Sequence, residues 1–284
     1  MSQVQAQFIT SNGLQLAYYD HGGTGETLLL LHGLSANAHY FDGLIGAGLN
    51  KGLRVIAVDL RGRGESDKPE GGFTKRDHAQ DIIGLMEGLG LAQAVIGGHS
   101  YGARLGMFMA VHYPEHVKKL VVMDAGYFAP DVVQLIMPSL ERLDQVFPSE
   151  EAYLDLIKAS PYYDTGFWDA GLEAYYRADL QRLPDGTYTT RSRRDHIMAI
   201  AAESTKEDWD SLMASIQQPV LLLQAPDGVG QGKPPILTDA NAVRTAAQIP
   251  HCTYRQMSGN HMTMGFGPHA AAIVKEIHAF INAG

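Results

Sequence analysis

A serine flanked by glycines offers the clearest chemistry in this chain. Ser100 lies at the centre of GHSYG, residues 98–102, between an apolar run at 94–96 and a helix-compatible run at 103–110. This order predicts a strand, a sharp turn and a helix, with the serine at the apex of the turn. The glycines let strand and helix approach each other, and the strained turn exposes the hydroxyl. The amide of Tyr101 then points toward the space above Ser100, where an oxyanion would develop.

A second motif, DLRGRGES, spans residues 59–66 and closes an apolar strand. We interpret this motif as a structural turn, because Gly62 and Gly64 can adopt positive φ and the side chains at its two ends can satisfy turn amides. Together with GHSYG, and with the pair His32-Gly33 after an earlier strand, the motif resembles the α/β-hydrolase family. The turn is a more specific marker of that family than GHSYG.

The resemblance implies roles for residues outside the pentapeptide. In this family the loop after the third strand supplies a second oxyanion amide, which corresponds here to Leu34, beside the amide of Tyr101. The catalytic histidine follows the last strand, and His261 stands there in the family's usual G-x-H context after Gly259. An imidazole with a pKa near ~6.5 can take the serine proton at neutral pH and return it to a leaving group. His32 is expected to order its own loop.

Two aspartates compete for the acid that orients the histidine. Most α/β-hydrolases take the acid from the loop after the strand that corresponds to 220–223, where this chain offers Asp227. The usual position is one residue later, however, where Gly228 stands in a glycine-rich loop. Asp124 directly follows the strand at 120–123, and some branches of the family take the acid from that strand. We favour Asp124 and keep Asp227 as the alternative.

Short apolar strands that alternate with helical patterns predict an α/β fold, a mostly parallel, doubly wound sheet with helices on both faces. An Asn-Gly turn joins the first two strands into a hairpin. The expected strands are 7–9, 14–19, 27–31, 54–58, 94–96, 120–123, 220–223 and 252–256, and the expected helices are 40–49, 74–89, the run after Ser100, and 270–283.

Residues 127–218 contain no clear strand-like run and are predicted to form an inserted, all-helical cap on a core made of residues 1–126 and 219–284. Sheets of this type bind ligands at the carboxyl ends of their strands, so the cap would roof the site. The cap is rich in aromatic residues, and we expect Phe167 and Trp168 to contact the substrate. Its expected helices are 131–146, 149–158, 166–180 and 191–203.

Composition restricts the partners. A formal charge of −9 and a pI near 5.7 argue against nucleic acid or an anionic membrane surface as a ligand. The single cysteine, Cys252, excludes an intrachain disulfide and favours a reducing compartment. The N-terminus lacks the features of a signal peptide, and the longest apolar run, 197–202, is too short to span a bilayer. We expect a cytoplasmic protein that acts on a small molecule as a monomer or homodimer.

No metal or cofactor is expected. His112 and His116 have the i, i+4 spacing of a helical ligand pair, but Pro114 interrupts the helix between them and no third ligand is suggested.

The family resemblance implies a serine hydrolase of small carboxylic esters. Ser100 would attack the carbonyl, His261 would move the proton, and Asp124 or Asp227 would orient the imidazole. Dehalogenases and epoxide hydrolases of this fold carry an aspartate where Ser100 stands, so those activities are disfavoured. Amides, lactones and carbon–carbon bonds remain alternatives for the same residues. A ligand receptor with little turnover is the alternative from another class.

Overall fold

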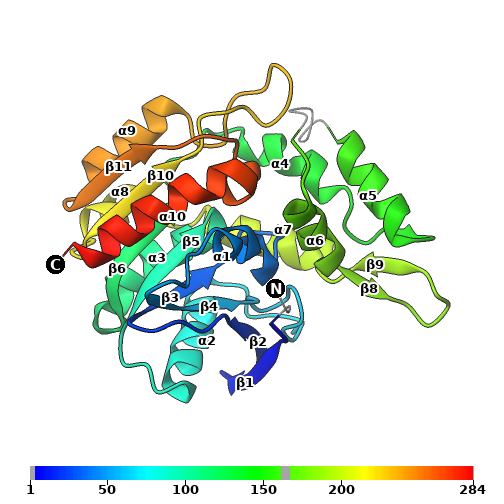
Figure 1. The fold of residues 1–284 in the computed structure, drawn as a ribbon, viewed down its shortest axis with the longest axis horizontal. Helices are drawn as coiled ribbons and strands as arrows, with labels where there is room; N and C mark the ends of the chain where they lie inside the picture. Colours follow the sequence, from blue (N-terminus) through cyan, green and yellow to red (C-terminus); the bar gives the residue numbers. More distant parts are fainter. Residues whose placement is uncertain (1–3, 161–166, 284) are drawn as a thin grey trace.

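A twisted sheet with helices on both faces forms the centre of the molecule (Figure 1). The sheet has eight strands. The structure, a computed structural model, describes residues 4–160 and 167–283. The strand order is β1-β2-β4-β3-β5-β6-β10-β11, antiparallel at the β1–β2 and β2–β4 pairs and parallel from β4 to β11. The strands are β1 (Gln7–Ser11), β2 (Leu14–Asp20), β3 (Glu26–Leu31), β4 (Leu53–Val58), β5 (Ala94–His99), β6 (Val117–Met123), β10 (Val220–Gln224) and β11 (Cys252–Gln256).

Helices cover both faces of this sheet, which confirms the predicted fold class. The four leucines 28–31 of β3 are fully buried, and they alternate between two separate apolar clusters, one on each face. Full burial explains why these central strands are continuously apolar. Helices α1 (Asp42–Gly46) and α10 (Gly267–Asn282) cover one face, and α2 (Lys75–Gly88), α3 (Tyr101–His112), α8 (Trp209–Ala214) and α9 (Asp239–Gln248) cover the other.

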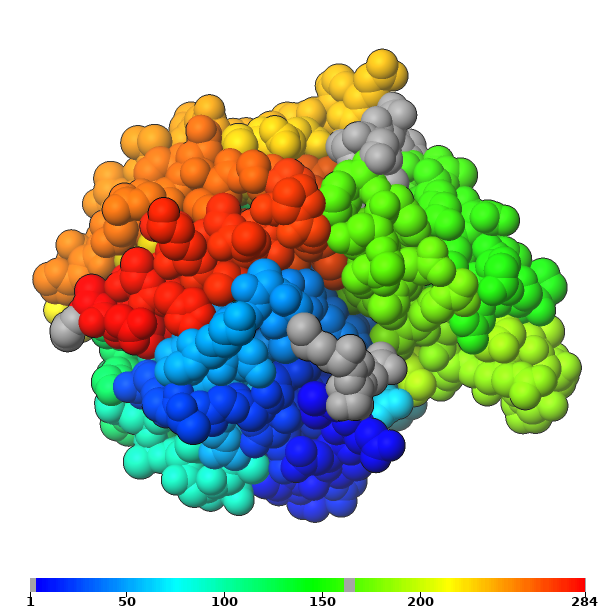
Figure 2. Space-filling view, in the orientation of Figure 1, coloured from blue at the N-terminus to red at the C-terminus, as the bar shows by residue number. Residues whose placement is uncertain are grey.

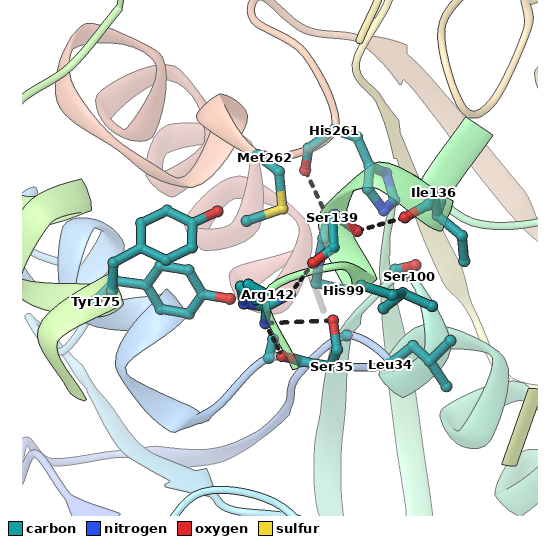
Figure 3. Close-up of a pocket in the computed structure, with 14 residues that line it drawn as sticks. Leu34, Ser35, His99, Ser100, Ile136, Ser139, Arg142, Tyr175, His261 and Met262 are labelled. Carbon is teal, nitrogen blue, oxygen red and sulfur yellow. Dashed lines mark hydrogen bonds between the residues drawn. The ribbon is translucent and has the colours of Figure 1, made fainter. Parts of the chain in front are cut away.

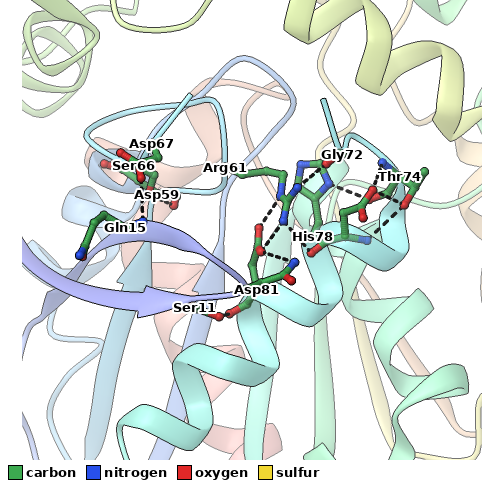
Figure 4. Close-up of polar contacts among 12 residues, drawn as sticks. Ser11, Gln15, Asp59, Arg61, Ser66, Asp67, Gly72, Thr74, His78 and Asp81 are labelled. Atoms are coloured by element: carbon green, nitrogen blue, oxygen red, sulfur yellow. Dashed lines mark hydrogen bonds and ion pairs between the residues drawn. The ribbon is translucent and has the colours of Figure 1, made fainter. Parts of the chain in front are cut away.

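The DLRGRGES segment is the tight turn that the sequence predicted (Figure 4). The two carboxylate oxygens of Asp59 accept hydrogen bonds from the amides of Ala38, at 2.7 Å, and Glu65, at 2.8 Å. Gly64 has φ +49°, and a Cβ there would lie 2.1 Å from the Asp59 carboxyl group. The buried aspartate therefore organises this turn and also anchors the loop that follows β3.

Most of the segment between β6 and β10 forms the cap, which lies beside the sheet (Figures 1 and 2). Its helices are α4 (Val132–Leu140), α5 (Glu150–Ala159), α6 (Ala170–Ala178) and α7 (Arg194–Ser204). The expectation of an all-helical cap is wrong, because β7 (Val146–Phe147), β9 (Tyr188–Thr190) and β8 (Leu180–Arg182) form a small antiparallel sheet. Strands of two or three residues are too short to show alternation in the sequence.

Helix boundaries in this segment also differ from the prediction. The helix expected over 131–146 ends at Leu140, two residues after Pro138, and β7 occupies the end of the expected range. Helix α8 lies within the range assigned to the cap, but it packs against α3 and α9, so it belongs with the helices that cover the sheet.

A buried ion pair ties the turn at 59–66 to α2 (Figure 4). Arg61 donates from Nε and Nη2 to the two carboxylate oxygens of Asp81, both at 2.5 Å, and the two side chains are 5% and 2% exposed. Removing one partner of such a pair leaves an uncompensated buried charge.

We expect Arg61→Met to lower the free energy of unfolding by about 3–5 kcal/mol, measured by urea denaturation. The matched control is Arg54→Met, because Arg54 pairs with Asp20 at 2.8 Å on the surface, where its side chain is 34% exposed. That change should cost about 1 kcal/mol or less. Equal losses in the two variants would contradict the prediction.

Candidate active site

Ser100 occupies a strained turn between β5 and α3. Its backbone has φ 53° and ψ −114°, a conformation that residues other than glycine rarely adopt. The neighbouring glycines are required by space, because a Cβ on Gly98 would lie 2.4 Å from the amide nitrogen of Ala103. A Cβ on Gly102 would lie 2.0 Å from the carbonyl oxygen of Leu31. The strand, the sharp turn and the helix that the sequence predicted here are therefore all present.

The loop after β3 runs beside Ser100, and His32 fixes its geometry. The Nε2 atom of His32 accepts a hydrogen bond from the amide of Leu60 at 3.0 Å, so Nδ1 carries the proton and donates to the carbonyl of Gly33 at 2.7 Å. Burial lowers the pKa of His32 to about 3, so the ring is neutral. The carbonyl and the next N–H of a trans peptide point in opposite directions, so this bond turns the amide of Leu34 away from His32.

The amides of Leu34 and Tyr101 are available to a ligand. The amide of Tyr101 lies in the first turn of α3, where N–H groups have no intrahelical acceptor. Within residues 4–160 and 167–283, neither amide donates to another group of the protein. Free N–H groups near a serine hydroxyl are the type of donor that stabilises an oxyanion, and this role stays a prediction for these two amides.

The carboxylate that contacts His261 belongs to Asp124. Asp124 directly follows β6 with φ 50° and is fully buried. Its Oδ1 accepts from the amide of Ala225 at 2.9 Å, and its Oδ2 lies 2.6 Å from Nδ1 of His261. A carboxylate at this ring nitrogen holds the imidazole in the tautomer that leaves Nε2 available for proton transfer.

Asp227 instead holds the loop that carries His261. Its amide donates to the carbonyl of Gly259 at 3.2 Å, and its Oδ2 accepts from the amide of Gly259 at 3.1 Å. This reciprocal pair joins the loop after β10 to the loop after β11 two residues before His261. The structure thus separates the two aspartates by position: Asp124 contacts the ring, and Asp227 contacts the backbone.

His99 is a site residue that the sequence reasoning passed over. Its Nε2 lies 2.8 Å from the carbonyl oxygen of His261, so this nitrogen carries the proton and donates. The His99 ring stacks on Tyr40 with 4.2 Å between centroids, and burial lowers its pKa well below the usual value. A neutral His99 therefore holds the backbone carbonyl of His261 through a hydrogen bond. Its place inside GHSYG was visible in the sequence, but the direction of its side chain was not.

A cavity of about 60 Å³ lies beside Ser100 and His261 (Figure 3). A water molecule needs roughly 10–15 Å³ of such space, so the cavity holds a group of only a few heavy atoms. The loop 33–36, His99 and Met262 form the core side of this cavity, and the cap contributes Ile136, Ser139, Leu140, Arg142, Tyr175 and Tyr176. A second cavity of about 200 Å³ lies within the cap and shares Ser139, Arg142 and Tyr176 with the first.

The aromatic residues expected at the substrate are not the ones that line this cavity. Phe167 packs against His269 with 5.5 Å between ring centroids, at the seam between cap and core. Trp168 stacks on Tyr176 at 5.9 Å, and its Nε1 donates to Glu173. Neither Phe167 nor Trp168 lines this cavity, and their contact with the substrate stays a prediction, because composition identifies an aromatic cap without showing which rings face inward.

In the described part of the chain, no cluster of three or more His, Cys, Asp or Glu side chains is arranged to hold a metal ion. Among the helices of the described residues, none combines the length and the apolar composition that a membrane span requires.

The sheet order and the arrangement around Ser100 define an α/β-hydrolase fold. Residues 26–156 match the family model described as alpha/beta hydrolase fold, and the chain as a whole has that fold. A crystal structure of E-2-(acetamidomethylene)succinate hydrolase superposes with a TM-score of 0.85 and 24% sequence identity, over 99% of this chain and 100% of that chain. At that identity, the similarity establishes the fold.

Curated relatives align over shorter stretches. The 2-(acetamidomethylene)succinate hydrolase of Mesorhizobium japonicum is 37% identical over 136 residues, which are 46% of this chain and 49% of that protein. The chain therefore spans about half the length of this relative. The 2-hydroxymuconate semialdehyde hydrolase of a Pseudomonas species is 29% identical over 71% of this chain and 81% of that protein.

The short contact between His261 and Asp124 can be tested without any substrate. A charge-assisted hydrogen bond of 2.6 Å should give a far-downfield proton resonance for Nδ1–H of His261. Asp124→Asn should move this resonance upfield, because the acceptor becomes neutral. Asp227→Asn, the matched control, should leave it in place. A resonance that responds only to the change at Asp227 would contradict the geometry.

Proposed function

We propose that this chain is a serine hydrolase that cleaves small carboxylic esters with Ser100, His261 and Asp124. The observation that carries the proposal is the 2.6 Å contact of His261 with the buried Asp124, in a ring that borders the same cavity as Ser100. Nucleophile, base and orienting acid come from the ends of β5, β11 and β6, which all lie at the carboxyl edge of the sheet. Ligands bind at that edge in sheets of this type.

The chemistry follows from the roles of these groups. His261 takes the proton from Ser100 through Nε2 as the serine oxygen attacks the carbonyl carbon. Asp124 stabilises the imidazolium that forms, and the amides of Leu34 and Tyr101 stabilise the oxyanion. His261 then gives its proton to the leaving group, and water releases the acyl group from Ser100 in a second cycle of the same steps.

Amide or carbon–carbon bond cleavage is the second candidate. The names of two relatives favour it, since one is a 2-(acetamidomethylene)succinate hydrolase and the other a 2-hydroxymuconate semialdehyde hydrolase. The proposed residues could serve this chemistry, because His261 can protonate a nitrogen or carbon leaving group as it protonates an alcohol. Parallel assays with an acetate ester and the corresponding acetamide distinguish the candidates by the ratio of their kcat/KM values.

A third possibility, a ligand receptor with little turnover, has less support, because Ser100, His261 and Asp124 are all present. A fluorophosphonate probe separates it from an enzyme. Rapid ester turnover with complete labelling at Ser100 supports the enzyme, whereas complete labelling with negligible turnover supports the receptor.

Ser100→Ala should reduce turnover on the order of 10⁴-fold or more, because the covalent nucleophile is lost. His261→Ala should cost about as much, and the double variant should be little worse than either, since the two residues act as a unit. Initial rates with a p-nitrophenyl ester measure all three. The circular dichroism spectrum of each variant should match that of the wild type. Activity within tenfold of wild type in Ser100→Ala, or losses that multiply in the double variant, would contradict the mechanism.

The small cavity predicts a preference for short acyl groups. Among p-nitrophenyl esters, acetate and propionate should be cleaved with a higher kcat/KM than hexanoate or octanoate. Ile136→Ala enlarges the cavity wall and should shift the optimum to a longer chain, since each buried methylene contributes about 0.8 kcal/mol.

Val133→Ala is the control for this experiment. Val133 lies on the same helix α4 as Ile136, but its side chain is exposed. This variant should keep the wild-type chain-length profile. An unchanged profile in Ile136→Ala, with normal folding, would show that this wall does not set acyl length.

A further inference from the structure

Arg142 is a buried cation in the cap, between α4 and β7. The residue is 4% exposed, and its Nε donates to Asp179 Oδ2 at 3.0 Å and to the hydroxyl of Tyr153 at 3.2 Å. Asp179 is itself buried and also accepts a hydrogen bond of 2.6 Å from Tyr153. The charge of Arg142 is therefore neutralised inside the cap, where the carboxylate of Asp179 holds the pKa of the arginine well above its usual value despite burial.

The other end of the same guanidinium crosses from the cap to the core (Figure 3). Its Nη2 donates to the carbonyl of Ser35 at 2.7 Å, and its Nη1 donates to the carbonyl of Ser139 in α4. Ser35 follows Leu34, whose amide is one of the two proposed oxyanion donors. Arg142 therefore ties α4, through Ser139, and the Asp179 carboxylate to the loop that carries that donor.

The carbonyls of the two residues that flank Leu34 are thus held from the core and from the cap. On the core side, His32 holds the carbonyl of Gly33 at 2.7 Å. On the cap side, Arg142 holds the carbonyl of Ser35 at 2.7 Å. The amide of Ala36 also donates to the carbonyl of Gly33, but this bond is long at 3.3 Å, and the Asp59 carboxylate anchors the loop farther along the chain, at the amide of Ala38. Without Arg142, the segment 34–36 would lose its shortest hydrogen bond and keep the 3.3 Å bond from Ala36 to Gly33.

We propose that Arg142 is a positioning residue that couples the cap to the oxyanion hole, by holding the Ser35 carbonyl so that the amide of Leu34 points at the reacting oxygen. This inference rests on the proposed function, in which Leu34 stabilises the oxyanion. The coupling makes the oxyanion hole complete only when the cap is seated on the core, so chemistry depends on the cap as well as on the sheet.

The partners of Arg142 distinguish this role from recognition of a charged substrate. The guanidinium has five N–H groups, and its three nitrogens already donate to Asp179, Tyr153, Ser139 and Ser35. Its charge is offset by a carboxylate at 3.0 Å. A residue that recognised an anionic substrate would instead present an unpaired fork to the cavity. The effect of Arg142 should therefore be the same for neutral and anionic substrates.

The experiment uses Arg142→Lys and Arg142→Met in the full-length protein. Lysine keeps the charge beside Asp179 but cannot reach Ser35 with a second nitrogen, so it should preserve the cap and release the loop. In both variants, kcat should fall about 10²-fold, since a misplaced group or a lost oxyanion donor costs this much, while KM stays within about threefold. The fall should be equal for p-nitrophenyl acetate and for the anionic p-nitrophenyl hemisuccinate.

The matched control is Arg177→Met. Arg177 is another arginine of the cap, partly exposed and paired with Glu150 and Glu173, and it has no contact with the loop after β3. Its kcat should stay at the wild-type value. A rise in KM confined to the hemisuccinate in Arg142→Lys would overturn the proposal, because it would make Arg142 a ligand for the substrate carboxylate. An unchanged kcat in Arg142→Lys would also overturn it.

A second measurement does not depend on turnover. Hydrogen exchange of the peptide that covers residues 32–38 should speed up in Arg142→Lys and remain as in the wild type in Arg177→Met. If Ser100→Ala shows that the proposed function is wrong, this exchange result still decides whether Arg142 holds the loop. Unchanged exchange in Arg142→Lys would overturn the coupling whatever the enzyme's activity.

Discussion

The contact between Asp124 and His261 depends on several distant parts of the chain at once. It joins the end of β6 to the loop after β11, 137 residues later. It also requires Asp124 to adopt φ 50° at full burial, a conformation that only surrounding structure can hold. The amide of Asp124 donates to Leu223, and the amide of Ala225 donates back to its Oδ1, so β10 fixes the carboxylate from the side. The parallel register of β6, β10 and β11 is thus a condition for the site.

Two histidines that are not proposed as catalytic groups hold the backbone around Ser100 and His261 in place. His32 and His99 are both buried and neutral, and each uses its single N–H to hold a backbone carbonyl. His32 fixes the peptide before Leu34, and His99 fixes the backbone of His261. A neutral imidazole suits this task because, unlike a cation, it carries no charge that burial would penalise. The site therefore depends on tautomers that the fold determines rather than on exposed titrating groups.

The sheet and the turn at Ser100 could be predicted from sequence because both follow local rules. A fully buried parallel strand is a continuous apolar run, as in β3, and the glycines at 98 and 102 are demanded by contacts of 2.4 and 2.0 Å that no side chain could tolerate. The cap followed no such rule. Its strands are too short to show an alternation of apolar and polar residues. Helix α4 continues through Pro138 and ends at Leu140, and the sequence does not show which residue ends it. Which aromatic rings face the cavity depends on helix rotation, and Tyr175 and Tyr176 do so while Trp168 packs behind them.

The choice between the two aspartates shows what sequence leaves open and why. Asp124 and Asp227 each follow a parallel strand, and the carboxyl ends of those strands meet at one edge, so both could approach His261. The path of the loop after β10 decides which of the two carboxylates reaches the His261 ring. Asp227 makes a reciprocal pair with Gly259 through its amide and its Oδ2, and this pair aligns the segment that leads to His261. The two carboxylates therefore have complementary positions, one setting the direction of the ring and the other the position of its backbone. A chain whose acid stood after β10 would need a different anchor for that loop.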